Sequence, residues 1–374
     1  MNTREYYQVR TGDMRQFCGL RRTYLAEGKA GGVEAVDLWN MAGLAATVLP
    51  GRGMDIARMS YRGIPLSYLA KPGITAPGYY DAAGTGWLRS FFGGMLTTCG
   101  LANAGPPNEY TDPVNGPVHL GQHGRISNTA AEDVGVFQGW TEGEEGETYR
   151  LSVTGRLREA CLFAENYTLR RTVTTELAAK CLRLDDVVTN DSDLAQPVML
   201  LYHINIGYPM LDEGARVYIS AGDSAPITAA ISPEAKKHPD GYRVMDPPIC
   251  GYTEALYFHH LRGSGLRSSH GPRPGRATAC LVNDRLGLAF YIRFDPAQLP
   301  FLTEWKMMGT SEYVLGLEPG NCVPVGQQRA KEEGTLEMLE PWGEKRVSIE
   351  FGVADGDAEI ARLLAEAGEE SAKP

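Results

Sequence analysis

The feature that most constrains the fold of this chain is a series of short runs in which apolar and polar residues alternate. Alternation with a period of two residues places successive side chains on opposite faces of a β-strand. The chain also contains 44 Gly and 23 Pro, which interrupt it too often for many long helices. The alternating runs cover residues 33–39, 149–154, 167–173, 181–188, 215–219 and 346–351.

Helical periodicity, by contrast, is clear only near the C-terminus. We expect a helix over residues 357–366, capped by Asp355 or Asp357, and a short helix within residues 15–25. A doubly wound α/β sheet would need helices between its strands, and such helices are missing from this sequence. The sequence therefore predicts an all-β fold, an antiparallel sandwich with few short helices.

The domain organisation follows from the absence of any long polar stretch that could serve as an interdomain linker. We expect residues 1–355 to form a single β-sandwich domain, and residues 356–374 to form a C-terminal helix with a frayed tail. Turn-forming residues at 190–193 and 284–287 predict hairpins. Residues 84–112 are rich in Gly, Pro and Asn, and predict a long ordered loop or a broken strand.

Composition excludes several classes of partner. The formal net charge is −10, which disfavours binding to nucleic acid or to an anionic membrane surface. Seven Cys are scattered singly, as expected of reduced thiols in a cytoplasmic protein. The first residues lack the apolar run of a secretion signal, and no apolar run is long enough to span a membrane, so we expect a cytoplasmic protein. A small-molecule ligand fits these observations, and so does a homodimer, although the sequence does not determine the oligomeric state.

Two residues at the ends of apolar runs could carry chemistry. His203 ends one such run, with Asn205 on the same face of the expected strand, and Glu318 ends another. Taken alone, His203 is better explained as a core histidine bonded to backbone, and Glu318 is equally compatible with a carboxylate that faces solvent. A buried carboxylate would be costly without a partner. Together, an imidazole and a carboxylate suit general acid–base catalysis near neutral pH.

A second imidazole and a guanidinium lie on either side of Gly124, which would let a ligand approach the backbone closely. They belong to His123 and Arg125, which a plain polar turn would explain equally well. His119 precedes His123 by four residues, a spacing that can bind a metal on a helix. Gly121 and Gly124 disfavour a helix here, so we expect no metal at this pair.

Two further segments present polar or aromatic side chains. A tight turn presents Arg52 and Asp55, either toward a ligand or as a salt bridge on a surface hairpin. Trp305 and Lys306 are adjacent in another strand-like run. They could form a stacking platform and a cation for a polar ligand, or an edge-strand aromatic and a lysine whose aliphatic stem covers the surface.

The order of three motifs resembles that of the aldose-1-epimerase (galactose mutarotase) superfamily. There, a His-Gly segment precedes a strand-end His followed by Asn, and a Leu-Glu-Pro strand comes last. Here the three motifs are His123-Gly124, His203-Ile204-Asn205 and Leu317-Glu318-Pro319. The chain is more closely similar to a bacterial subgroup of aldose-1-epimerase-like proteins of unknown function. That similarity runs from about residue 30 to residue 352, through the segments 51–55, 93–101, 123–127 and 315–321.

The resemblance implies a galactose-mutarotase-like antiparallel β-supersandwich with a cleft on its concave face. It implies that Glu318 is the general base, that His203 is the general acid, and that His123 helps to hold the sugar. Arg52 falls near the position of a sugar-binding arginine. The chain departs from ordinary mutarotases after the strand-end histidine, where an aromatic Tyr-Phe-Asn-Leu run is replaced by residues 204–207. The usual Asp partner of the sugar hydroxyls has no match.

These residues predict a carbohydrate isomerase, most specifically an aldose 1-epimerase that needs no metal or redox cofactor. The basic residues Arg52, Arg125 and Lys306 favour an anionic sugar. Two alternatives stay open: a sugar isomerase or epimerase that moves a carbon-bound proton, and a non-catalytic sugar-binding or sensing protein. The residues predicted to bind substrate are His123, Arg52, Arg125, Asp55, Asn205, Trp305, Lys306 and Asn321.

Overall fold

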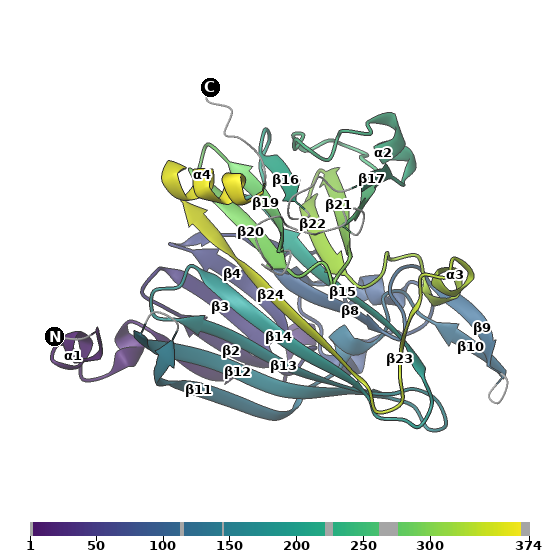
Figure 1. The fold of residues 1–374 in the computed structure, drawn as a ribbon, viewed down its shortest axis with the longest axis horizontal. Helices are drawn as coiled ribbons and strands as arrows, with labels where there is room; N and C mark the ends of the chain where they lie inside the picture. The colour runs from purple at the N-terminus through teal and green to yellow at the C-terminus, as the bar shows by residue number, and fades with distance from the viewer. Residues whose placement is uncertain (1–2, 113–115, 144–145, 221–226, 262–275, 368–374) are drawn as a thin grey trace, which may run out of the picture.

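Two large antiparallel β-sheets dominate the computed structural model, which describes residues 3–112, 116–143, 146–220, 227–261 and 276–367 (Figure 1). The first sheet has 12 strands and the second has 8. The 12-stranded sheet runs, in hydrogen-bonding order, β1 (Gly19–Tyr24), β2 (Glu34–Trp39), β3 (Leu44–Leu49), β4 (Asp55–Tyr61), β8 (Leu96–Leu101), β15 (Gln196–Ile206), β22 (Glu312–Gly320), β21 (Phe301–Gly309), β18 (Ala255–His260) and β17 (Ile227–Ala230), with β5 (Ile64–Pro65) on β4 and β23 (Glu337–Leu339) on β15. The 8-stranded sheet runs β11 (Glu132–Gly143), β12 (Gly146–Ala160), β13 (Asn166–Glu176), β14 (Cys181–Asn190), β24 (Glu344–Asp355), β20 (Leu288–Phe294), β19 (Ala277–Asn283) and β16 (Arg216–Ser220).

The remaining elements are short. Two ribbons pair β9 (Asn108–Asp112) with β10 (Gly116–Leu120), and β6 (Tyr68–Leu69) with β7 (Gly93–Gly94). The α-helices are α1 (Thr3–Gln8), α2 (Pro233–Lys237), α3 (Gln327–Glu332) and α4 (Asp357–Glu366). Single 3-10 turns are η1 (Met14–Gln16), η2 (Gly28–Ala30), η3 (Pro77–Tyr79), η4 (Gly86–Arg89) and η5 (Ile126–Asn128). Within the described residues, none of these helices has the length and apolar character needed to cross a bilayer.

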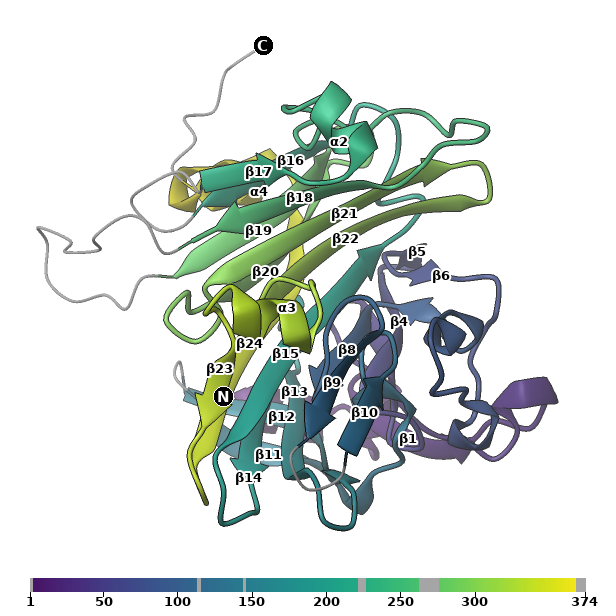
Figure 2. The same ribbon diagram turned by 90° about the vertical axis from the view of Figure 1, so that its right-hand side faces the viewer.

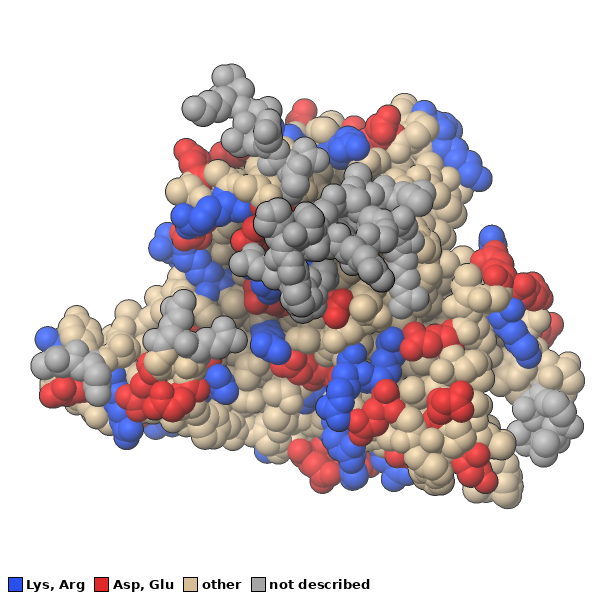
Figure 3. Space-filling view, in the orientation of Figure 1, with Lys and Arg blue, Asp and Glu red and all other residues tan. Residues whose placement is uncertain are grey.

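The 8-stranded sheet behaves as the alternating pattern predicts. Along β12, every second residue from Tyr149 to Glu159 is buried, while most of the residues between them reach solvent. Cross-strand ion pairs occupy the outer face, as where Arg150 on β12 meets Glu176 on β13 at 3.0 Å. Figure 3 shows Lys and Arg interleaved with Asp and Glu over the described part of the face it presents. The polar side chains of this sheet therefore compensate one another's charge.

Strand β15 differs, because residues 198–206 are buried on both faces. One face contributes Leu200, Tyr202 and Ile204 to the large core that both sheets share. The other face contributes Met199 and Leu201 to a smaller apolar cluster. That second cluster also contains residues of η4, β8 and α3, and Figure 2 shows α3 and the β9–β10 ribbon in front of β8 and β15. The candidate site side chains His203 and Asn205 lie on this second face.

A buried ion-pair network links the two sheets behind β15. Arg171 on β13 donates to Asp186 at 2.6 Å and 2.8 Å, to Asp55 at 3.2 Å and to Thr98 at 2.8 Å. Tyr202 on β15 donates to Asp186 at 2.8 Å. The arginine and both carboxylates have no exposed side-chain surface, so each charge depends on the others for compensation.

The structure corrects three local predictions. Residues 190–193 form no hairpin, because the chain there crosses from β14 in one sheet to β15 in the other. Residues 15–25 form no α-helix: η1 ends at Gln16 and β1 begins at Gly19. Helix α4 has the predicted bounds, but its N-cap is Gly356, which offers no capping side chain.

Other predictions are confirmed. The hairpin at 284–287 joins β19 to β20. The segment 84–112 is a broken strand made of η4, β7, β8 and β9. The predicted tail beyond residue 367 lies outside the described residues.

Candidate active site

His203 and Glu318 meet on one face of the 12-stranded sheet. Their strands β15 and β22 are antiparallel neighbours, and the register that pairs Ile204 with Leu317 brings the two side chains together. Nε2 of His203 lies 3.2 Å from Oε1 of Glu318. The His203 side chain is 8% exposed and that of Glu318 is 3% exposed, so both groups are almost withdrawn from water.

Aromatic rings surround the His203 imidazole. The ring centroid of Phe91 lies 5.1 Å away, that of Trp305 5.3 Å, that of His123 6.0 Å and that of Trp87 6.4 Å. Trp87 and Phe91 stack on each other at 4.7 Å. Trp87 lies in η4 and Phe91 follows it, so the loop before β7 covers the acid–base pair.

Burial sets the protonation of this pair. It raises the pKa of Glu318 well above its ordinary value, and nearby Glu254 raises it further. Burial lowers the pKa of His203 to about 3, assisted by the neighbouring His123, whose own pKa is lowered to about 4. These shifts favour the state in which the Glu318 carboxyl holds a proton and the His203 imidazole is neutral.

Several polar atoms beside the pair have no hydrogen-bond partner among the described residues. They are Nδ1 of His203, Oδ1 of Asn205, Oε1 of Glu318 and Oγ1 of Thr303. The 3.2 Å approach of Oε1 to Nε2 of His203 is therefore a close contact without hydrogen-bond geometry. Thr303 is the strand partner of Glu318 on β21, and Asn205 lies two residues from His203. Because buried polar groups are normally satisfied, such a cluster is typical of a surface that receives a polar ligand or water.

His123 is held by its backbone. Its φ of +55° lies in the left-handed region, next to Gly124 at +70°. Its carbonyl accepts from Gly100 N–H at 3.0 Å, and its Nδ1 accepts from Gly105 N–H at 3.3 Å. The neutral ring therefore carries its proton on Nε2. Arg125, two residues later, has an exposed side chain.

Trp305 and Asn205 also lie at the site. The indole Nε1 of Trp305 donates to Glu254 at 2.9 Å. The amide of Asn205 donates to the carbonyls of Gly93 at 3.2 Å and of His203 at 2.9 Å, which leaves its Oδ1 free of partners in the described structure.

The structure does not bring Arg52 or Lys306 to the pair. Arg52 is fully buried and donates to the carbonyls of Ser127 at 3.0 Å, Thr75 at 3.1 Å and Ser90 at 2.5 Å. Lys306 follows Trp305 on β21 and therefore points to the opposite face of the sheet. There its ammonium binds the carbonyls of residues 241 and 244 and a carboxylate oxygen of residue 246, each at 2.7 Å. The prediction of an anionic sugar used three basic residues, and two of them, Arg52 and Lys306, instead hold backbone carbonyls away from the pair.

Asp55 and Asn321 have structural contacts as well. Asp55 belongs to the buried network of Arg171, and not to a surface hairpin. Asn321 accepts from Leu200 N–H at 2.7 Å and donates to the Val198 carbonyl at 2.9 Å, so it fixes the strand that carries His203.

Sequence reasoning missed four residues near the pair: Trp87, Phe91, Glu254 and Thr303. An aromatic cluster inside a glycine-rich segment was a usable signal for the first two, since exposed loops rarely keep large aromatic residues. No local signal marks the other two, because only strand pairing brings them to the site.

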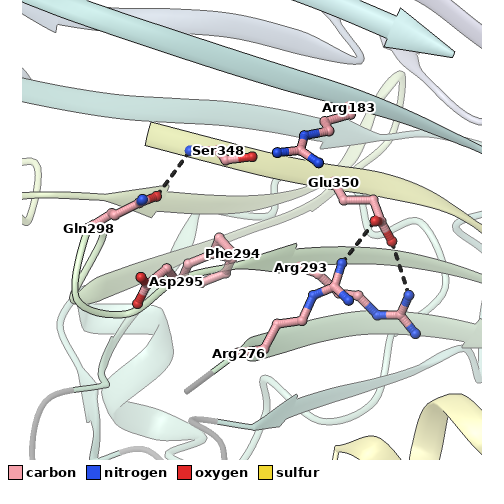
Figure 4. Close-up of a pocket in the computed structure, with 8 residues that line it drawn as sticks. All are labelled: Arg183, Arg276, Arg293, Phe294, Asp295, Gln298, Ser348 and Glu350. Carbon is pink, nitrogen blue, oxygen red and sulfur yellow. Dashed lines mark hydrogen bonds and ion pairs between the residues drawn. The ribbon is translucent and has the colours of Figure 1, made fainter. Parts of the chain in front are cut away.

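A second buried imidazole–carboxylate contact joins His259 on β18 to Glu304 on β21 at 3.5 Å, and Nε2 of His259 and both carboxylate oxygens of Glu304 lack hydrogen-bond partners among the described residues. No group of three or more His, Cys, Asp and Glu side chains there is arranged to hold a metal ion. A hollow of about 260 Å³ on the 8-stranded sheet contains Arg183, Arg276 and Arg293 (Figure 4). Arg276 and Arg293 both bind Glu350, at 2.8 Å and 3.0 Å, Arg293 also binds Glu366 at 2.5 Å, and Arg183 binds Asp185 at 3.0 Å. Their charges are therefore already compensated.

Comparison with known proteins agrees with the architecture. A family model described as a domain of unknown function (DUF4432) matches residues 30–353. No curated protein matches the chain with significance. A candidate aldose 1-epimerase from Klebsiella pneumoniae superimposes with a TM-score of 0.80 at 23% identity, covering 97% of this chain and 89% of its own.

More distant structures share the fold. A galactose mutarotase-like protein from Clostridium acetobutylicum has a TM-score of 0.58 at 14% identity, over 91% of this chain and 99% of its own. Galactose 1-epimerase from Lactobacillus acidophilus has a TM-score of 0.56 at 13% identity, over 91% of this chain and all of its own. At these identities the likeness establishes the fold alone, and it confirms the galactose-mutarotase-like sandwich predicted from sequence.

Proposed function

Because the chain belongs to the DUF4432 family and has the galactose-mutarotase-like fold, we propose that it is an aldose 1-epimerase whose acid–base pair is Glu318 and His203. The observation that carries this proposal is the 3.2 Å approach of the two side chains on one buried face of the sheet. Nearby aromatic rings and unpaired polar atoms supply the stacking surface and hydrogen-bonding groups that a sugar ring requires.

The reaction needs two coupled proton transfers. The base removes the proton of the anomeric hydroxyl, a carbonyl forms at C1, and the bond from C1 to the ring oxygen breaks. The ring oxygen takes that electron pair and receives a proton from the acid. Rotation about the bond between C1 and C2, followed by closure in the reverse sense, produces the other anomer.

The single proton on the pair is sufficient for this chemistry. We assign the base to Glu318 and the acid to His203, which requires the proton to move from the resting carboxyl to the imidazole. Bound sugar hydroxyls would hydrogen-bond to the resulting carboxylate and imidazolium, and such bonds stabilise the charged forms. His123, Trp305 and Asn205 are the residues we propose for holding the sugar.

Substitution of Glu318 by Gln tests the role of the carboxyl directly. We expect turnover to fall by about 10²–10⁴-fold, because one proton-transfer group is lost while the side-chain shape is kept. The measurement is the interconversion of freshly dissolved α-anomers, followed by polarimetry or NMR, with neutral aldoses, a uronate and a sugar phosphate as substrates. Glu312→Gln is the matched control, since Glu312 lies on the same strand but pairs with Lys71 at the surface.

The same samples distinguish the epimerase from the two alternative functions, a sugar isomerase or epimerase acting at carbon and a non-catalytic sugar-binding protein. Deuterium from the solvent at a sugar carbon would identify an isomerase or epimerase acting on a carbon-bound proton, because mutarotation leaves those hydrogens in place. Binding without turnover in the wild-type protein would identify a sugar-binding or sensing protein. Equal turnover in wild type and Glu318→Gln would exclude the proposed pair.

A further inference from the structure

A glycine on β22 shapes the space in which the Glu318 carboxyl lies. Gly316 and Glu318 are two positions apart on the strand, so they face the same side of the sheet. A Cβ atom on Gly316 would lie 2.5 Å from Oε1 of Glu318. The carboxyl therefore occupies the volume that any other side chain at position 316 would fill.

The backbone itself does not require glycine at this position. The φ angle of Gly316 lies outside the left-handed region, and the residue is paired with Trp305 on one side and Asn205 on the other. Glycine inside a strand costs conformational entropy and leaves no side chain to pack, so it usually marks a close approach. Here the group that approaches is the carboxyl of Glu318.

We propose that Gly316 is a positioning residue, whose missing side chain lets the Glu318 carboxyl fold back along β22 to within 3.2 Å of Nε2 of His203. The inference deepens the proposed function and rests on it for its catalytic meaning. With alanine at position 316, the carboxyl oxygen must move by at least 0.5 Å, from 2.5 Å to the shortest distance of 3.0 Å that real Cβ atoms show.

The fold should tolerate this change. The atom displaced is the end of a flexible side chain, and the next contact is Cβ of Trp305 at 3.1 Å, which needs only a small adjustment. The substitution is therefore expected to change the position of the Glu318 carboxyl relative to His203 and to leave the sheet intact. A misplacement of about 1 Å at a catalytic group can cost about 10²-fold in rate.

Gly316→Ala tests the kinetic consequence. We expect kcat to fall by about 10–100-fold with KM changed by less than about threefold, because the sugar-holding residues are untouched while the proton-transfer group is displaced. Gly309→Ala on β21 is the matched control: its Cβ would approach only the mobile end of Met307 closely, at 3.0 Å, and it should retain kcat.

A stability cycle tests the steric assignment without reference to activity. In the Glu318→Ala background the carboxyl is gone, so Gly316→Ala should cost less free energy of unfolding than it does in the wild-type background, and should restore folding if the single variant fails to fold. Equal costs in the two backgrounds, or an unchanged kcat in Gly316→Ala, would overturn the inference. A wild-type protein without turnover would refute the proposed function, whereas the cycle would still decide the role of Gly316.

Discussion

At the scale of single residues, the unusual property of the His203–Glu318 pair is that burial pushes the two pKa values in opposite directions. Burial lowers the pKa of His203 to about 3, so its imidazole stays neutral until the solution is strongly acidic. The raised pKa of Glu318 keeps the single proton on the pair well above the ordinary carboxyl range. The active form therefore extends further into acid than an ordinary histidine would allow.

For the proposed epimerase, these shifts predict the pH dependence of kcat/KM. We expect kcat/KM to stay nearly constant as pH falls from 7 to about 5, and to decline as pH rises through the raised pKa of Glu318, where the pair loses its proton. The measurement is the rate of mutarotation between pH 4.5 and 9, corrected for the spontaneous reaction at each pH. An acid limb with an apparent pKa near 6.5 would contradict the prediction, because it would mean that His203 titrates as if it were in water.

At the scale of elements, η4 and the residues that follow it determine whether the site is open. Trp87 and Phe91 are buried, stack on each other and lie tilted against the two imidazoles, so the proposed sugar substrate would have to displace at least part of this cover to reach the pair. The segment lies between Gly84 and the Gly93–Gly94 strand β7, all three of which have positive φ. These glycines give the backbone freedom at both ends of the aromatic cover.

Removal of the Phe91 ring should expose the histidine. We expect Phe91→Ala to increase the rate at which diethyl pyrocarbonate modifies His203 by about tenfold or more, because water and reagent reach the ring, and to raise its pKa toward the ordinary value. Modification is followed by mass spectrometry at pH 6. Phe137→Ala, on the exposed face of β11, is the control that should leave the rate unchanged. No increase in Phe91→Ala would mean that other groups seal the site.

At the scale of the whole molecule, the two sheets share one large core and one buried charge network. Apolar residues of both sheets form a single cluster, and Arg171 reaches from β13 to the Asp55 carboxylate of β4. An arrangement of this kind favours cooperative unfolding, which would agree with the predicted single domain over residues 1–355.

We therefore expect a single urea transition in which far-ultraviolet circular dichroism and tryptophan fluorescence coincide. Arg171→Leu should lower the free energy of unfolding by about 3–5 kcal/mol, since it leaves the carboxylates of Asp55 and Asp186 buried without their partner. The control Arg150→Leu removes a surface ion pair and should cost about 1 kcal/mol or less. Two separate transitions, or a small effect of Arg171→Leu, would contradict a shared core.

Part of the site could be predicted from the sequence because its residues follow apolar runs. His203 and Glu318 are polar residues at the ends of such runs, and their burial on strands was readable from the pattern. The assignment of Lys306 to the site could have been avoided from the same pattern. Adjacent residues of a strand face opposite sides, so Trp305 and Lys306 could not both reach one ligand. The role of Arg52 could not be decided from the sequence, because its carbonyl partners come from three segments that lie 75, 23 and 38 positions away.

The sequence by itself determined the class of the fold. Alternation with a period of two is a local property, as are turn residues, and together they specify strands and exclude interleaved helices. Only the tertiary structure decided which strands are neighbours, since β15 and β22 come together through hydrogen bonds between residues more than a hundred positions apart. That pairing produces the 3.2 Å contact, the dry surroundings that shift both pKa values and the space above Gly316 that the carboxyl fills. These properties depend on distance and burial, which no local pattern encodes.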